Sequence, residues 1–119
     1  MGLEIKWTLF AKKELKKIYS YYAENISLIT AKKIVTGIIK DVNILEKHPE
    51  IGQVEELLIE YEEIFRFLLS KRNYKIIYWI NIENQLIEIV DVFDVRQNPS
   101  KLNKDSILSY LIYFSIIPF

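Results

Sequence analysis

Basic side chains and one tryptophan in the second half of the chain are the residues best suited to chemistry. They lie in or beside strand-like segments, and they are Arg66, Lys71, Arg72, Lys75, Trp79 and Arg96. Cations that meet on one surface stabilise the negative charge of a phosphate. Metal-free cleavage of RNA further needs a group that activates the 2′-hydroxyl and an acid for the leaving oxygen. We therefore treat all six residues as candidates for contact with a target or partner, and Arg66, Lys75 and Arg96 as candidates for catalysis.

The N-terminal elements that would support these residues follow from hydrophobic periodicity. Residues 3–7 alternate apolar and polar side chains, which predicts a short strand with one buried face. Thr8 then offers an N-cap for a helix that ends near residues 24–25, and Ser27 offers an N-cap for a second helix. The apolar face of the second helix continues until residues 48–49, His-Pro, end it. Because the link between the helices is short, we expect an αα-hairpin.

The second half of the chain reads as strands. Residues 64–69, 74–80 and 86–93 are rich in β-branched and aromatic side chains and are separated by short turns, which predicts a three-stranded antiparallel meander. Residues 49–63 have no clear period and read as a loop, with at most one helical turn. The element order indicates an α+β fold with the helical hairpin on one sheet face. We expect the other face to be open, with Lys75 on it by strand alternation.

Composition restricts the class of protein. With 119 residues the chain is long enough for one packed domain and too short for two. It has no cysteine and a single histidine, so we expect no disulfide, no metal site and no cofactor. The N-terminus lacks a signal peptide, which predicts a cytoplasmic protein. The apolar stretch at residues 107–119 is well short of the roughly 20 residues that cross a bilayer, so we expect no membrane association.

Charge is balanced overall but unevenly distributed. The chain has 16 basic and 16 acidic residues. Residues 1–47 carry nine lysines and five acids, and residues 48–63 carry six glutamates and no lysine or arginine. We interpret the lysine run at residues 12–17 and the glutamate-rich segment as solvent-facing surfaces, although a minority of such lysine runs contact nucleic acid.

Several segments, in this order, resemble the RelE/ParE toxin superfamily over roughly residues 3–101. They are AKKELKKIYSYY, LEKHPEIGQ, YKIIYWI and IEIVDVFDVRQNP. The most specific are the Pro-x-x-Gly motif at residues 49–52, the Tyr-basic-Ile-Ile-Tyr strand at 74–78, and the Arg-x-x-Pro motif at 96–99. The resemblance implies a toxin domain at residues 1–101, an apolar extension of unknown role at 102–119, and neutralisation by a cognate antitoxin that folds on binding.

Two activities occur in this superfamily. RelE-like members cleave messenger RNA on the ribosome, and ParE-like members block DNA gyrase. RelE-like nucleases are similar at Lys75 and approximately at Arg96, but they also use a tyrosine or histidine near the C-terminal end of the last strand. Here the residues after Arg96 are Gln-Asn-Pro-Ser-Lys. This departure favours the ParE-like activity, which is protein binding without covalent chemistry by the toxin.

Alternative interpretations remain at this stage. The chain would be an endoribonuclease if Lys75 and Arg96 stabilise charge and Tyr110 or Tyr113 folds back to supply the missing group. It would be an inactive member if it only binds the antitoxin. The basic residues also fit a solvated sheet face, on which Glu88 pairs with Arg66 or Lys75, and Asp91 or Asp94 with Arg96. The apolar tail could cover the sheet, form a homodimer contact or receive the antitoxin.

Overall fold

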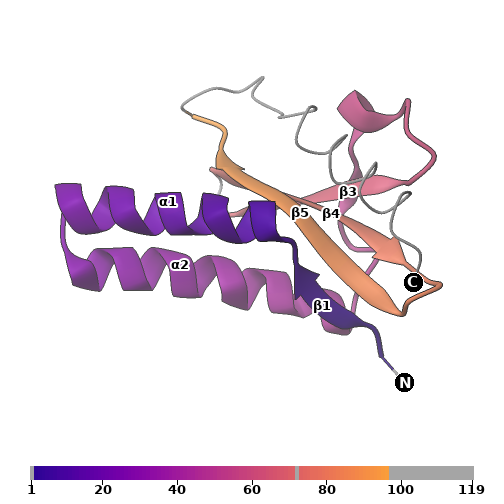
Figure 1. Ribbon diagram of the computed structural model, residues 1–119, viewed down its shortest axis with the longest axis horizontal. Coiled ribbons are helices and arrows are strands. Elements are labelled where there is room, and N and C mark those ends of the chain that lie inside the picture. The colour runs from indigo at the N-terminus through magenta and orange to yellow at the C-terminus, as the bar shows by residue number, and fades with distance from the viewer. Residues whose placement is uncertain (1, 72, 97–119) are drawn as a thin grey trace.

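In the computed structural model, which describes residues 2–71 and 73–96, two antiparallel helices pack on one face of a five-stranded sheet (Figure 1). The strand order is β1-β5-β4-β3-β2. The helices are α1 (Leu9–Asn25) and α2 (Leu28–Val42), and the strands are β1 (Glu4–Trp7), β2 (Gln53–Val54), β3 (Phe65–Ser70), β4 (Tyr74–Asn81) and β5 (Leu86–Asp94). This arrangement confirms the predicted α+β fold.

The junction between β1 and α1 joins the first residues of the chain to the last strand. β1 runs parallel to β5, with Trp7 opposite Ile89. Thr8 caps α1 as predicted, because its hydroxyl oxygen accepts a hydrogen bond from the Ala11 backbone N–H at 3.2 Å. The same hydroxyl donates to the Ile89 carbonyl at 2.9 Å. The cap therefore also fixes the start of α1 against the centre of β5.

α2 is shorter than its apolar pattern predicted. Ser27 caps it by accepting from the Thr30 backbone N–H at 3.1 Å. The α-helix ends at Val42, and a 3₁₀ turn, η1 (Asn43–Glu46), continues the same direction and keeps Leu45 fully buried. A 3₁₀ turn is common where a helix must stop, and Pro49 follows it closely. The apolar pattern therefore predicted the length of the helical segment correctly. It did not predict that the last turn is a 3₁₀ helix.

The meander of β3, β4 and β5 is confirmed, with one irregularity. Ile77 of β4 lies opposite Asp91, whereas Tyr78 lies opposite Ile89, so Val90 is an extra residue in β5. A bulge of this kind changes which face the following side chains occupy. Ile87 and Ile89 pack in the core beneath the helices, and the next residue of β5 in that core is Val92, three positions after Ile89, while Val90 and Phe93 pack on the other face.

Residues 49–63 contain more structure than the predicted loop. The single helical turn is present as η2 (Glu56–Leu58), and β2 forms a further edge strand that pairs with β3 through Gln53 opposite Phe67 and Val54 opposite Arg66. Both β2 residues are exposed, so the strand has no apolar alternation that could have predicted it.

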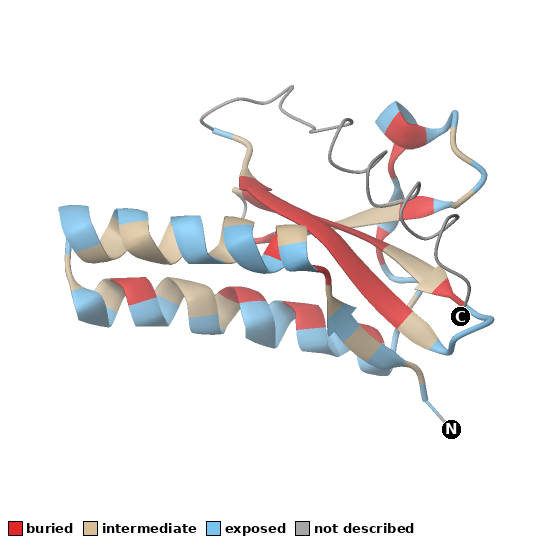
Figure 2. Ribbon diagram, viewed as in Figure 1, coloured by how far each residue is buried: buried red, intermediate tan, exposed pale blue. Residues whose placement is uncertain are grey.

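The second face of the sheet is partly buried, which corrects the expectation of an open face. Figure 2 shows buried residues along the central strands. One core lies between sheet and helices. A second cluster on the opposite face consists of Leu58, Phe65, Ile77, Val90 and Phe93, with Tyr61 and Trp79 packed against it. Leu58 and Tyr61 belong to the segment after β2, which therefore covers part of the face. Within the described residues, no helix has the length and apolar character that crossing a membrane requires.

Candidate functional site

Lys75 lies on the second sheet face, within an ion pair. Its ammonium group contacts the Glu55 carboxylate and lies 4.3 Å from the centre of the Phe67 ring. The exposed fraction of the side chain is 17% for Lys75 and 4% for Glu55. Lys75 lies on the face that was predicted to be open, but the segment after β2 brings Glu55 over the strand, so its ion-pair partner is Glu55 and not the alternative Glu88. In this structure the Glu55 carboxylate neutralises the Lys75 ammonium group, which an RNA phosphate would need as its cation.

Arg66 lies on the opposite face of the sheet from Lys75. Directly opposite residues in an antiparallel pair share a face, and Arg66 is opposite Tyr78, which alternates with Lys75 along β4. The Arg66 guanidinium donates to the Gly52 carbonyl at 3.0 Å and lies 3.5 Å from the Glu50 carbonyl. Its role in this structure is to hold the chain between η1 and β2.

The same chain segment is held by a buried phenol. The Tyr78 hydroxyl donates to the Pro49 carbonyl at 2.8 Å and accepts from the Gly52 N–H at 2.9 Å. The Pro-x-x-Gly and Tyr-basic-Ile-Ile-Tyr motifs are therefore two halves of one structural unit. Burial raises the pKa of the Tyr78 phenol above its ordinary value of 10.0, so it stays protonated at neutral pH and serves as a hydrogen-bonding group.

Arg96 follows the end of β5 and is paired with Asp94. Its Nε and Nη2 atoms donate to the Asp94 carboxylate at 3.2 and 3.0 Å, and its backbone N–H donates at 2.8 Å. Burial alone would raise the pKa of Asp94, but these hydrogen bonds outweigh it and hold the pKa below the ordinary 3.8. The exposed fraction of the Arg96 side chain is 64%, so it is accessible to a partner. The pairing with Asp94 is one that the sequence analysis considered.

Two phenols lie beside this ion pair. The Tyr74 hydroxyl donates to the Tyr22 hydroxyl at 2.8 Å, and Tyr22 in turn adds to the larger effect of Asp94 in raising the pKa of Arg96. Burial, and then the hydrogen bond with Tyr22, raise the pKa of Tyr74. A phenol with a raised pKa is a poor general base at neutral pH. Tyr22 is on α1 and Tyr74 on β4, so only their contact across the boundary between the two elements reveals this cluster.

The remaining candidates lie apart from these groups. Lys71 is in the β3–β4 turn with a positive φ of 51°, and the end of its side chain covers Gly37 of α2. Trp79 is half-buried against the second cluster, and within residues 2–71 and 73–96 its buried Nε1 has no hydrogen-bond partner. Arg72, Tyr110 and Tyr113 lie outside the described residues.

The structure therefore does not bring the three catalytic candidates together. Lys75 is on one sheet face with Glu55, Arg66 is on the other with the Gly52 carbonyl, and Arg96 is beyond the end of β5 with Asp94. In the described part of the chain, no group of three or more His, Cys, Asp or Glu side chains is placed to hold a metal ion. What the arrangement offers is separate contact points for a macromolecular partner.

Comparison with known proteins identifies the class. The fold matches those of solved chains from ParDE and RelE toxin systems. The family model of the ParE toxin of the type II toxin–antitoxin system parDE matches residues 5–99. Because the match spans most of the chain, the protein belongs to the ParE toxin family and is a toxin of the type II class. No curated protein matches the chain significantly.

Solved structures share the fold at low sequence identity. A chain described as a chromosomal ParDE system from P. aeruginosa is 24% identical with a TM-score of 0.64, covering 77% of this chain and 95% of that one. A variant of the E. coli toxin RelE in the free state is 15% identical with a TM-score of 0.58, covering 92% and 98%. The RelBE2 toxin–antitoxin complex from Mycobacterium tuberculosis is 16% identical with a TM-score of 0.54, covering 79% and 99%.

Proposed function

We propose that this toxin acts in the cytoplasm by binding and inhibiting DNA gyrase, without covalent chemistry of its own. The observation that carries the proposal is the match of residues 5–99 to the ParE toxin family. The arrangement of the cations supports it, since Lys75 is paired with Glu55 and Arg96 with Asp94. An inhibitor that binds a protein does not need these groups to meet around one phosphate.

The RelE-like alternative is less well supported. Metal-free cleavage of RNA needs a base, a charge stabiliser and an acid that converge on the same phosphodiester. Arg66 and Lys75 lie on opposite faces of the sheet, and burial raises the pKa of the Tyr74 phenol beside the Arg96–Asp94 pair. An active nuclease would have to break the Lys75–Glu55 pair or draw on residues beyond 96.

A cognate antitoxin is the proposed partner, as the type II class implies and as in the ParDE and RelBE structures that share the fold. β2 ends the sheet, so its outer edge can accept an added strand. Exposed apolar side chains surround this edge, and they are Ile51, Val54, Leu57, Ile59 and Ile64. We propose that the antitoxin covers this surface. A homodimer formed through residues 102–119 stays a prediction, because they lie outside the described residues.

Three assays test the proposal, one with purified toxin and two in cells that express it. We expect the toxin to inhibit supercoiling by purified gyrase, and expect co-expression with the adjacent antitoxin gene to restore growth. Messenger RNA from cells that express the toxin should show no new 5′ ends within translated codons. New ends that disappear in Lys75→Ala and Arg96→Ala, but persist in the exposed-lysine control Lys6→Ala, would establish the nuclease instead. A chain with neither effect that still binds the antitoxin would be an inactive member.

A further inference from the structure

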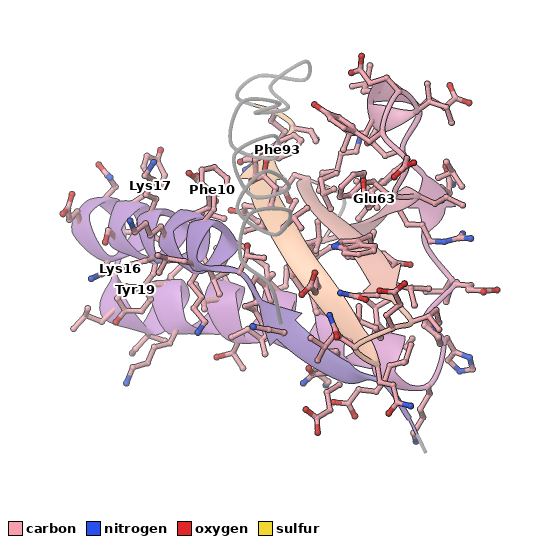
Figure 3. All side chains as sticks on the ribbon, turned by 45° about the vertical axis from the view of Figure 1, so that its right-hand side comes forward. Phe10, Lys16, Lys17, Tyr19, Glu63 and Phe93 are labelled. Atoms are coloured by element: carbon pink, nitrogen blue, oxygen red, sulfur yellow. The ribbon has the colours of Figure 1, made fainter. Side chains whose placement is uncertain are left out.

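The helical hairpin carries most of the positive charge of the described chain. Its two helices contain seven lysines against three acidic residues, and all seven are exposed. The lysines are Lys12, Lys13, Lys16, Lys17, Lys32, Lys33 and Lys40. Figure 3 shows Lys16 and Lys17 on α1 and Glu63 at the far side of the sheet, in the segment with no lysine or arginine. Charge is therefore separated between two ends of the molecule.

The lysines of α1 face away from the sheet. The core-facing side chains of this helix are Ala11, Leu15, Ile18 and Tyr22. At 3.6 residues per turn, Lys13 and Lys17 fall on the opposite side, with Lys16 and Tyr21 flanking them. These residues, together with Ser20, Glu24 and Asn25, line a shallow open groove along the helix. A phosphate backbone that followed the groove would lie close to a lysine at each of the first turns of α1.

The three acids of the hairpin offset only part of this charge. Glu24 lines the groove, Glu14 pairs with Lys17 at 3.2 Å, and Asp41 accepts a hydrogen bond from the Ser70 hydroxyl at 2.5 Å. Seven lysines against three acids leave the two helices with a net charge of +4. The hairpin also projects past the edge of the sheet, so its outer side is accessible along its length (Figure 1). Tyr21, with an exposed fraction of 51%, adds an aromatic surface beside the lysines.

We propose that the outer face of the α1–α2 hairpin binds the phosphate backbone of double-stranded DNA. Each helix with its side chains is about 10–12 Å across, so the pair is too wide to enter a major groove of about 12 Å. The contacts are therefore made to phosphates and carry no base specificity. The choice of DNA over RNA rests on the proposed function, because gyrase acts on DNA, and the hairpin would contact the duplex that the enzyme holds.

The test compares two double variants that remove equal charge. Lys13→Gln/Lys16→Gln alters the hairpin, whereas Lys6→Gln/Lys47→Gln alters exposed lysines on β1 and after η1. Binding of a short labelled DNA duplex is measured by fluorescence anisotropy across a salt series, with no gyrase present. Each lost phosphate contact reduces the slope of log K against log salt by about 0.9. We expect the hairpin variant to lose about two units of slope and on the order of 50-fold in affinity near 0.1 M salt, and the control to match wild type.

Four outcomes would overturn the inference. The first is wild-type DNA binding that is absent or independent of salt, and the second is an equal loss of DNA affinity in both variants. The third is tighter binding to an RNA duplex of the same sequence. The fourth is a hairpin variant that no longer captures the antitoxin but still binds DNA. Supercoiling inhibition is measured in parallel. Inhibition of gyrase without DNA binding would refute this inference and leave the proposed function standing. DNA binding without inhibition would refute the proposed function and leave DNA binding by the hairpin standing. Thermal unfolding of both variants checks that the fold is intact.

Discussion

Tyr78 and Gly52 show how a motif can be structural in this chain. The phenol forms two hydrogen bonds to the segment between Pro49 and Gly52, and Arg66 adds a third from the neighbouring strand. These bonds close the path from η1 to β2, so Tyr78, Gly52 and Arg66 hold the sheet edge. Residues that look conspicuous in a sequence can therefore serve the fold and leave the target contact to others.

Gly52→Ala should destabilise the protein. A Cβ at this position would overlap the Tyr78 hydroxyl and lie 2.8 Å from the Phe67 carbonyl oxygen, and neither neighbour can move without breaking a hydrogen bond or the β2–β3 pairing. We expect a loss of about 1–3 kcal/mol in the free energy of unfolding, as for other overpacking substitutions. Urea denaturation measures it. Gly2→Ala, whose Cβ would lie 3.9 Å from the nearest atom, is the control, and equal losses in the two variants would contradict this account.

Asp94 should make the protein sensitive to acid. Its pKa in the folded state lies below the ordinary 3.8, so its contribution to stability is present above the unfolded pKa and is lost as the pH falls through the folded pKa. Because the Arg96 side chain is 64% exposed, solvent screens the pair and added salt weakens it further, so we expect a small contribution to stability. Urea unfolding of wild type and Asp94→Asn between about pH 2 and 6 measures it. Arg96→Gln should flatten the dependence as Asp94→Asn does, and an unchanged slope in both would refute the coupling.

At the scale of elements, the pair between Lys75 and Glu55 fastens the segment after β2 to β4. Removing one partner leaves the other charge buried, so we expect Lys75→Met or Glu55→Gln to cost roughly 3 kcal/mol. Gln at position 55 can still accept the hydrogen bond from the Leu57 N–H, so Glu55→Gln removes the charge and keeps this hydrogen bond. The double variant should regain a large part of the loss, because no unpaired charge remains. A double-mutant cycle by urea unfolding decides, and additive losses would show that the two groups do not stabilise each other.

The elements that could be predicted from the sequence are those set by local interactions. Thr8 and Ser27 cap the helices, and short turns fix the antiparallel meander, because each signal acts within a few residues of itself. β2 and the bulge at Val90 were not predictable, since both depend on the partner strand. The burial of the second face was missed for a similar reason. Leu58 and Tyr61, which cover part of it, belong to residues 49–63, where the sequence has no hydrophobic periodicity.

The candidate site was predictable only as a set of residue types. Placing Arg66 relative to Lys75 requires the β3–β4 register, which sets Arg66 opposite Tyr78 and so on the other face. The partner of Lys75 depends on where the segment after β2 packs. The pairing of Arg96 with Asp94 was accessible to the sequence analysis because the two residues are neighbours along the chain, whereas the contact of Tyr22 with Tyr74 joins residues 52 positions apart.

For the whole molecule, the division at residue 101 remains a prediction that truncation can test. Among residues 2–71 and 73–96, both core clusters are built from residues between Leu3 and Val95. A chain of residues 1–101 should therefore unfold in one cooperative transition, with a free energy in the range of about 5–15 kcal/mol that is typical of single domains. Circular dichroism in urea measures it, with the full chain as reference. A non-cooperative transition would mean that residues 102–119 are part of the domain. If the truncated chain folds but no longer inhibits its target, the extension serves function and not the fold.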